Sequence, residues 1–66
     1  MKLEVNGTTV ELPPEATVEM LLAALDKADT PCAVERNGTL VPWKTRGGTA
    51  LADGDRIEIV TLVGGG

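Results

Sequence analysis

The sequence predicts an α+β fold, in which one main helix packs on one face of a mixed sheet of four to five strands. Three observations predict it: two alternating segments joined by Asn6-Gly7, one stretch with helical periodicity, and a final β-rich run over residues 56–62. At 66 residues the chain forms one domain with a thin core. Because Trp43 is the only aromatic residue, that core must be aliphatic.

The chain opens with a predicted β-hairpin. Residues 2–5 alternate between polar and apolar, as half-buried strands do, and residues 8–12 alternate again with Val10 and Leu12 on one face. Asn6-Gly7 between them readily takes the positive φ angles of a type I′ turn.

A short helix is predicted next, because Pro13-Pro14 cannot continue a central strand. Thr17 can cap its first turn, and Glu19 suits the positive end of the helix dipole. We expect about ten helical residues, ended by Pro31. The apolar stripe that must pack on the sheet consists of Val18, Leu21, Leu22 and Leu25.

The second half of the chain predicts three further segments of sheet. Residues 32–37 form a strand with Cys32 and Val34 on one face, and Asn37-Gly38 turns the chain into a short apolar piece, residues 40–41, ended by Pro42. The polar residues 44–49 are expected to form a loop. Asp53-Gly54-Asp55 then makes a turn into the final strand.

The order of these elements predicts that the first and last strands pair in parallel at the centre, through a right-handed connection. This is the β-grasp arrangement of ubiquitin-like proteins. We therefore expect a β-grasp domain over residues 1–62, followed by a flexible glycine tail over residues 63–66.

Composition excludes several classes of function. The net charge of −4 and the scattered basic residues argue against nucleic-acid binding; an acidic surface suits a basic partner, or serves solubility alone. With no His and with Cys32 as the single cysteine, no metal site and no Ser-His or Cys-His pair is expected. The N-terminus does not read as a signal peptide, and no apolar run is long enough to span a membrane. We expect a cytoplasmic protein that is not an enzyme.

The last residues, Val63-Gly64-Gly65-Gly66, are the strongest candidate site. Four extended residues reach roughly 13 Å, and glycines pass through a narrow channel that any Cβ would obstruct. A partner enzyme can present the Gly66 carboxylate to ATP, with Gly65 and Gly64 threading the channel. A frayed end is the alternative interpretation.

A second candidate is a docking surface at Val60, Leu62 and Val63. If Ile57 and Ile59 face the helix, then Val60 and Leu62 point to the other side of the sheet, where an apolar patch often marks a docking site.

Other residues have simpler interpretations. Asp53 and Asp55 are turn formers whose side chains bond local N–H groups, and Cys32 is a small core residue with no visible basic neighbour to activate it. Trp43 either anchors a partner or caps the core. Gly47-Gly48 lacks the residues of a phosphate loop.

The run from Asp53 to Val60, followed by the closing glycines, resembles the thiamine-biosynthesis sulfur carrier family, ThiS. The opening residues 3–7, the helix start at Thr17-Val18 and the segment from Asn37 to Pro42 are also similar to that family, so the resemblance covers the whole length. Trp43 stands where the resemblance leads us to expect a polar residue.

The resemblance implies a chain that is a co-substrate. A ThiF-like enzyme would adenylate the carboxylate of Gly66 with ATP, and sulfur from a cysteine desulfurase would convert it to a thiocarboxylate for the thiazole synthase ThiG. No cofactor is expected on the chain itself. Two alternatives stay open: a carrier for another product, as in the molybdopterin carrier MoaD, and a ubiquitin-like binding module whose tail is never activated.

Overall fold

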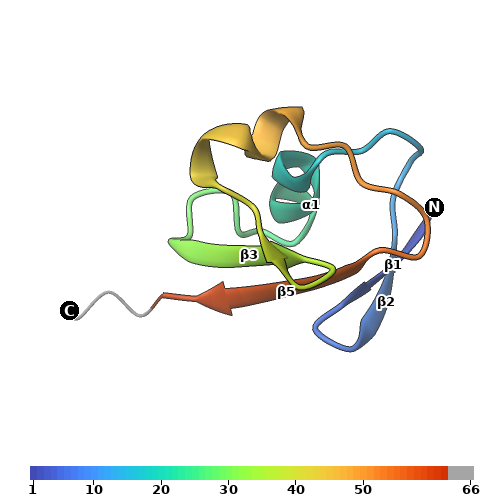
Figure 1. The fold of residues 1–66 in the computed structure, drawn as a ribbon, viewed down its shortest axis with the longest axis horizontal. Coiled ribbons are helices and arrows are strands. Elements are labelled where there is room, and N and C mark those ends of the chain that lie inside the picture. Colours follow the sequence, from blue (N-terminus) through green and yellow to red (C-terminus); the bar gives the residue numbers. More distant parts are fainter. Residues whose placement is uncertain (63–66) are drawn as a thin grey trace.

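A computed structural model describes residues 1–62 as a five-stranded mixed sheet with a helical layer on one face (Figure 1). The strand order is β2-β1-β5-β3-β4, so the first and last strands are neighbours in the middle of the sheet. β1 and β5 run parallel, and the other neighbouring strands run antiparallel. The predicted β-grasp fold is confirmed. In chain order the elements are β1 (Lys2–Val5), β2 (Thr8–Glu11), α1 (Val18–Ala24), β3 (Cys32–Arg36), β4 (Thr39–Leu40), η1 (Trp43–Gly48) and β5 (Arg56–Thr61).

Both Asn-Gly turns form as predicted. Asn6 and Gly7 have φ angles of 49° and 83°, and Asn37 and Gly38 have φ angles of 51° and 85°. Positive φ at both central residues is what a type I′ turn requires, and the twist of that turn matches the twist of the strands it joins.

The start of α1 follows the sequence prediction. Thr17 Oγ1 accepts a hydrogen bond from the Met20 N–H at 3.2 Å, which satisfies one of the free donors of the first turn. Val18, Leu21 and Leu22 are buried and Leu25 is partly buried against the core. The predicted apolar stripe therefore packs on the sheet.

The end of α1 differs from the prediction. The helix has seven residues, and it stops well before Pro31. Asp26 takes a left-handed φ of 59°, its N–H donates to the Ala23 carbonyl at 3.1 Å, and the Lys27 N–H donates to the Leu22 carbonyl at 2.7 Å. These two bonds form a Schellman motif, which ends a helix without a proline.

The segment expected to be a loop, residues 44–49, is mostly helical instead. Trp43–Gly48 forms the 3₁₀ helix η1, with the Thr45 N–H donating to the Pro42 carbonyl at 3.0 Å. A six-residue 3₁₀ helix has no strong propensity signal, so its polar, glycine-containing sequence predicted a loop. In Figure 1, η1 lies on the same side of the sheet as α1.

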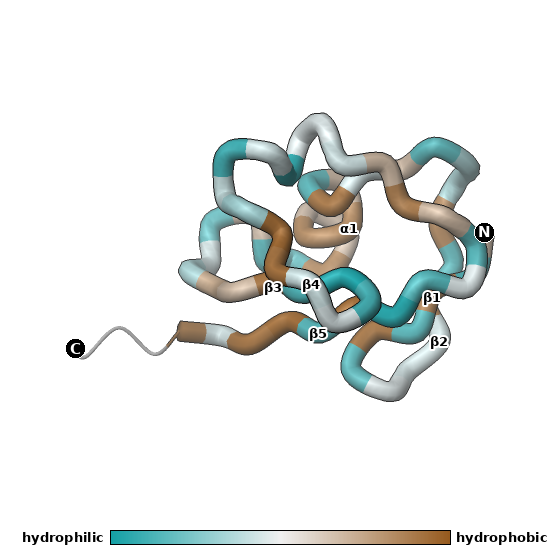
Figure 2. Tube along the Cα trace, in the orientation of Figure 1, coloured by the Kyte–Doolittle hydropathy of each residue, from teal (hydrophilic) through white to brown (hydrophobic). Residues whose placement is uncertain are grey.

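The core lies between the sheet and this helical layer. Figure 2 shows hydrophobic segments on α1 and on the strands that face it. The core is aliphatic, as expected, with Cys32 its one sulfur-containing member. Its buried residues are Leu3, Val5, Val18, Leu21, Leu22, Cys32, Val34, Val41, Leu51, Ile57 and Ile59.

Candidate functional site

Strand β5 turns alternate side chains toward two different environments. Ile57 and Ile59 lie in the core beneath the helical layer, whereas Val60 and Leu62 are 57% and 52% exposed. Both helices lie on the other side of the sheet (Figure 1), so neither covers this pair. The prediction that Val60 and Leu62 lie opposite the helix is confirmed; their role in docking stays a prediction.

The exposed surface around Val60 is larger than the sequence indicated. Ala33 lies directly opposite Val60, and Leu40 lies directly opposite Glu35. Glu35 in turn lies directly opposite Glu58, and like charges in that position are unfavourable. We call this surface the outer face; its members are Ala33, Glu35, Leu40, Glu58, Val60 and Leu62.

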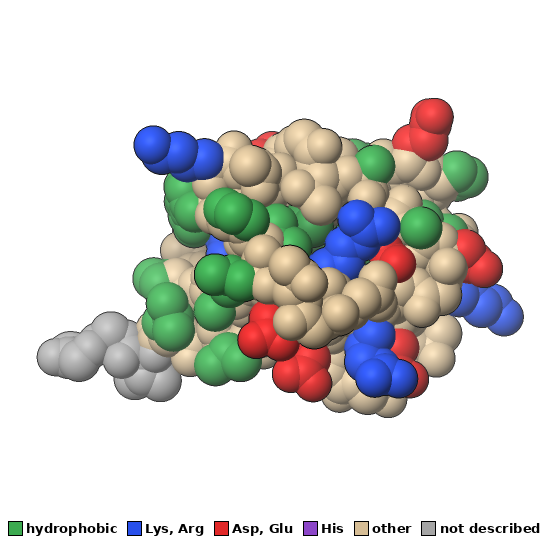
Figure 3. Space-filling model, viewed as in Figure 1, with side chains coloured by type: hydrophobic (Ala, Val, Ile, Leu, Met, Phe, Trp, Pro, Cys, Tyr) green, Lys and Arg blue, Asp and Glu red, His purple; other side chains and the backbone are tan. Residues whose placement is uncertain are grey.

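The composition of the outer face points to binding more than to stability. Figure 3 shows hydrophobic side chains gathered at the end of the molecule where β5 leaves the sheet, with acidic side chains beside them. An apolar patch with an acidic margin complements a partner that has an apolar surface and basic neighbours. Sequence reasoning missed Leu40 and the opposed glutamates because strand register decides which residues meet.

The start of β5 is held by the carboxylate of Asp55, which is buried. It accepts hydrogen bonds from Arg36 Nε at 2.8 Å, from Asn37 Nδ2 at 3.0 Å and from the Ala52 N–H at 2.8 Å. Burial raises the pKa of Asp55, but the bonds from Ala52, Asn37 and Arg36, with the charge of Arg36, outweigh it and leave that pKa below its ordinary value. The bond from the nearby Ala52 N–H confirms the predicted local turn role, whereas the bonds from Arg36 and Asn37 were not predicted.

Two further side chains tie β5 to the N-terminal hairpin. Asp53 Oδ1 accepts a hydrogen bond from the Lys2 N–H at 2.6 Å. The prediction that Asp53 bonds a local N–H group is therefore wrong, since its partner lies on β1. Asn6 accepts from the Ile59 N–H at 2.8 Å and donates to the Ile59 carbonyl at 3.1 Å. Its amide thus continues the β1–β5 pairing beyond the end of β1.

The other end of β5 leads out of the sheet. Thr61 pairs with Cys32 across the β3–β5 ladder, and the Leu62 N–H donates to the Pro31 carbonyl at 2.9 Å. Four predicted site residues follow, and all of them lie outside the described residues: Val63, Gly64, Gly65 and Gly66.

Cys32 is buried, as predicted, but it does have a basic neighbour. The Arg46 guanidinium donates to the Cys32 carbonyl at 2.6 Å and lies 3.9 Å from its sulfur. Trp43 does not cap the core, because its side chain is 67% exposed; its ring lies 4.8 Å from the Arg46 guanidinium carbon. Sequence reasoning passed over Arg46, since an arginine in a polar segment gives no sign that it will be buried.

Within residues 1–62 no three His, Cys, Asp or Glu side chains come together as metal ligands. No helix of this region combines the length and the apolar character needed to cross a membrane.

The comparisons with known proteins agree with this architecture. The ThiS family profile matches residues 3–66. A thiamine biosynthesis protein (ThiS) from Geobacter metallireducens has a crystal structure that is 33% identical, covers 100% of both chains and superposes with a TM-score of 0.84. SAMP1 from Haloferax volcanii is 23% identical over 98% of this chain and 97% of its own, with a TM-score of 0.63, which is a likeness of fold alone.

A thiazole synthase from Paramagnetospirillum magneticum is 42% identical over the whole of this chain. The chain spans only 20% of the length of that relative. A segment similar to this chain thus lies within a polypeptide about five times as long.

Proposed function

Since this chain belongs to the ThiS family, we propose that it is a sulfur carrier whose C-terminal glycine carboxylate, on Gly66, becomes a thiocarboxylate. The family match carries the proposal, because it extends through residues 63–66 as well as the fold. The chain is a co-substrate here, and partner enzymes supply the catalysis.

The chemistry needs no side chain of the carrier. A carboxylate oxygen of Gly66 forms a bond to the α-phosphorus of ATP in the adenylating enzyme, and pyrophosphate leaves. The terminal sulfur of the persulfide that a cysteine desulfurase forms then adds to the acyl carbon, and AMP leaves with the electron pair of the broken C–O bond. A thiol, such as excess cysteine, next attacks the S–S bond of this acyl persulfide, so that the thiocarboxylate leaves and the thiol is oxidised to a disulfide. Glycines at 64, 65 and 66 let this carboxylate enter a narrow enzyme channel.

The outer face supports the docking part of the proposal. Leu62 is the last described residue of the chain and Val60 lies two residues before it, so an enzyme that holds the tail is well placed to cover them. The opposed Glu35 and Glu58 favour a ThiF-like partner with basic residues around an apolar contact. Val63 completes this proposed contact.

The acceptor of the sulfur is proposed to be a thiazole synthase of the ThiG type. The support is the relative named thiazole synthase, which contains a segment similar to this chain in one polypeptide. A carrier and a synthase that bind each other repeatedly bind more often when they are joined in one polypeptide, because the linkage raises their effective concentration. ATP-dependent activation also fits the expected cytoplasmic location.

The test is the intact mass of the purified chain after incubation with ATP, a ThiF-like enzyme and a desulfurase with cysteine. We expect a gain equal to the exchange of one oxygen for sulfur, mapped to Gly66 and lost without ATP. A chain without Gly65 and Gly66 should show no gain, although its fold is unchanged. The matched control is Gly48→Ala, since a Cβ there has open space.

Two other outcomes separate the alternatives. Conversion only by an enzyme that activates MoaD-type carriers would assign the chain to another product. No conversion by either enzyme, with an active control carrier in the same mixture, would leave a binding module and overturn the proposal.

A further inference from the structure

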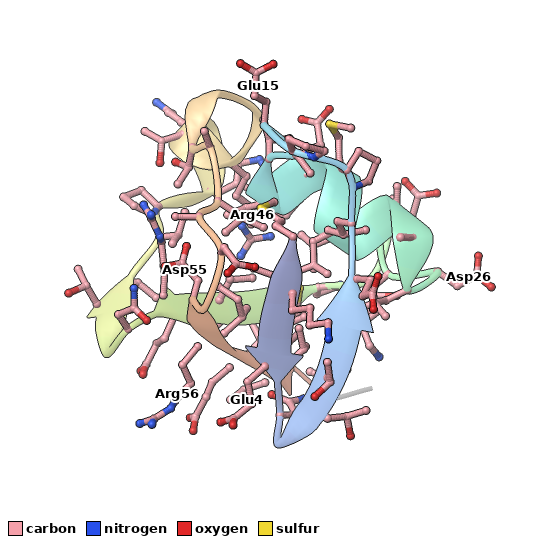
Figure 4. The ribbon with its side chains drawn as sticks, turned by 90° about the vertical axis from the view of Figure 1, so that its right-hand side faces the viewer. Glu4, Glu15, Asp26, Arg46, Asp55 and Arg56 are labelled. Carbon is pink, nitrogen blue, oxygen red and sulfur yellow. The ribbon has the colours of Figure 1, made fainter. Side chains whose placement is uncertain are left out.

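Arg46 is an unusual residue in this small fold, because its guanidinium is buried without an ion pair to any described carboxylate. The side chain is 7% exposed, and Figure 4 shows it inside the molecule, whereas the labelled Glu4 and Arg56 point outward from the sheet. One terminal nitrogen donates to the Cys32 carbonyl and the other lies near the Cys32 sulfur. Within residues 1–62 its Nε has no protein acceptor, and no carboxylate lies within ion-pair distance of it.

This arrangement is costly for the free protein. A buried guanidinium without a counter-ion loses hydration that its contacts replace only in part. The Trp43 ring, 4.8 Å from the guanidinium carbon, recovers a fraction of the lost hydration free energy through a cation–π contact. An acceptor brought to the guanidinium would recover more, since hydrogen bonds between ionised groups are about twice as strong as neutral ones.

Arg46 lines a hollow between α1 and η1 with room for such an acceptor. The hollow has a volume of about 300 Å³, and its walls are mainly apolar. The apolar wall and the exposed Trp43 suit an aliphatic stem, and Arg46 suits a charged tip. The lining residues are Glu19, Leu22, Ala23, Ala28, Trp43 and Arg46.

Glu19 narrows the choice of occupant. Glu19 lines the same hollow, and its carboxylate lies beside Gly47 of η1. It would repel a doubly charged phosphate more strongly than a singly charged carboxylate. The hollow is therefore matched to a group with one negative charge and a short apolar stem. Aspartate and glutamate side chains have this chemistry.

The position of the hollow indicates where that side chain comes from. Arg46 holds the carbonyl of Cys32, the residue that pairs with Thr61 near the end of β5. The hollow thus lies at the end of the sheet from which the chain leaves toward Gly66. A protein that engages the tail reaches this end, and an exposed tryptophan is a residue type enriched at binding hot spots.

We propose that the hollow between α1 and η1 receives an acidic side chain of the enzyme that engages the tail, with the carboxylate beside the Arg46 guanidinium and the stem against Trp43. The identity of this partner rests on the proposed sulfur-carrier function. The recognition of a carboxylate by Arg46 does not.

The carboxylate chemistry is tested on the full chain by nuclear magnetic resonance. The probe is N-acetylglutamate methylamide, and the matched control is N-acetylglutamine methylamide, which has the same shape and no charge. We expect saturable shifts of the Arg46 Nε–H and Trp43 indole signals with the glutamate probe, at least fivefold weaker with the glutamine control. Glu19→Gln should tighten binding of the glutamate probe by about threefold, because a like charge is removed. Equal responses to the two probes, or none, would overturn the proposal.

The partner is tested by steady-state kinetics with a ThiF-like enzyme. Trp43→Ala, at an exposed site, should raise the KM for the carrier about fivefold or more with little change in kcat. Lys44→Ala, an exposed neighbour on η1, should leave both unchanged. Arg46→Lys should lose the response to the glutamate probe. If that variant does not fold, the KM of Trp43→Ala still tests whether the adenylating enzyme contacts the hollow. An unchanged KM for Trp43→Ala would overturn the assignment to this partner.

The two proposals fail in different ways. If the wild-type chain gains no sulfur, the proposed function fails, while the resonance titration still reports on the hollow. If sulfur is gained but the glutamate and glutamine probes behave alike, the further inference fails alone.

Discussion

Strand β5 serves two purposes with alternate residues, and its two faces are built differently. On the inner side, Ile57 and Ile59 are buried beneath α1, and Asp55, which immediately precedes the strand, is buried and bonded to Arg36. On the outer side, Glu58 stands opposite Glu35, and Val60 is exposed. The inner face has the features that stabilise a fold, and the outer face has features that do not.

The difference teaches how so small a protein combines a core with a binding surface. A sheet covered on one side leaves its other side to solvent, and the period of two along a strand lets one segment supply both sides. The two sets of residues should therefore respond differently to substitution. Four predictions test this, and their expected effects decrease in the order given.

The largest effect is expected for Ile57→Ala, on the inner face. Ile57 is fully buried, so truncation should lower the free energy of unfolding by about 2–5 kcal/mol. That loss is comparable with the whole stability of a domain this small. Urea unfolding followed by circular dichroism measures it. Val60→Ala, the outer-face control, should change stability by less than about 0.5 kcal/mol; similar losses for both would remove the distinction between the faces.

The next effect is expected for Asp55→Asn, which puts a neutral amide where Arg36, Asn37 and the Ala52 N–H all donate. We expect a loss of about 1–3 kcal/mol at neutral pH, measured by urea unfolding.

The same substitution has a defined pH dependence. The pKa of Asp55 is lower in the folded chain than its ordinary value of 3.8, so the stability it contributes is fully present above that value. It is lost as the pH falls from there through the folded pKa. The difference between wild type and Asp55→Asn should therefore shrink on acidification; a difference independent of pH would contradict the assigned role of the carboxylate.

A smaller effect, and on binding only, is expected for the double substitution Val60→Ala and Leu62→Ala. The KM for the carrier with a ThiF-like enzyme should rise about tenfold, as for residues at the centre of an interface, while the unfolding midpoint stays nearly constant. Met20→Ala is the matched control, since Met20 is also an exposed apolar residue but lies on α1. An unchanged KM for the double variant would mean that the outer face is not used in activation.

The smallest effect is expected for Glu58→Gln, which removes one of two opposed like charges. Stability should rise by about 0.2–1 kcal/mol at low salt, and the gain should fade at high salt as screening increases. The KM for the carrier, measured with the adenylating enzyme, should rise in the same variant. A loss of stability would show that the outer face also stabilises the fold.

Local patterns in the sequence predicted most of the fold. The two Asn-Gly turns, the Thr17 cap and the Leu21-Leu22 stripe each depend on residues close together in the chain, and each is confirmed. The end of α1 was missed because Asp26 is not the glycine usually found at a left-handed helix end. The 3₁₀ helix η1 was missed because its residues carry no helical periodicity.

Part of the candidate site was also predictable. The alternation along residues 56–62 predicts that Ile57 and Val60 lie on opposite faces of the sheet. Because the helix covers one face, Ile57 is expected to be buried and Val60 exposed. The surroundings of Val60 were not predictable, because Ala33 and the Glu35–Glu58 pair reach it through strand register.

The sequence by itself determined the strands and the main helix, their order, an aliphatic core and the resemblance to the ThiS family, because these follow from spacing and composition along the chain. Only the tertiary structure decided that Asp55 is a buried anion held by three donors, that Glu35 faces Glu58, and that the Arg46 guanidinium is buried beneath Trp43. Each of these depends on groups brought together from different elements. A buried charge needs hydrogen-bond or ion-pair partners in place of water, and no local sequence pattern shows which charges will be buried.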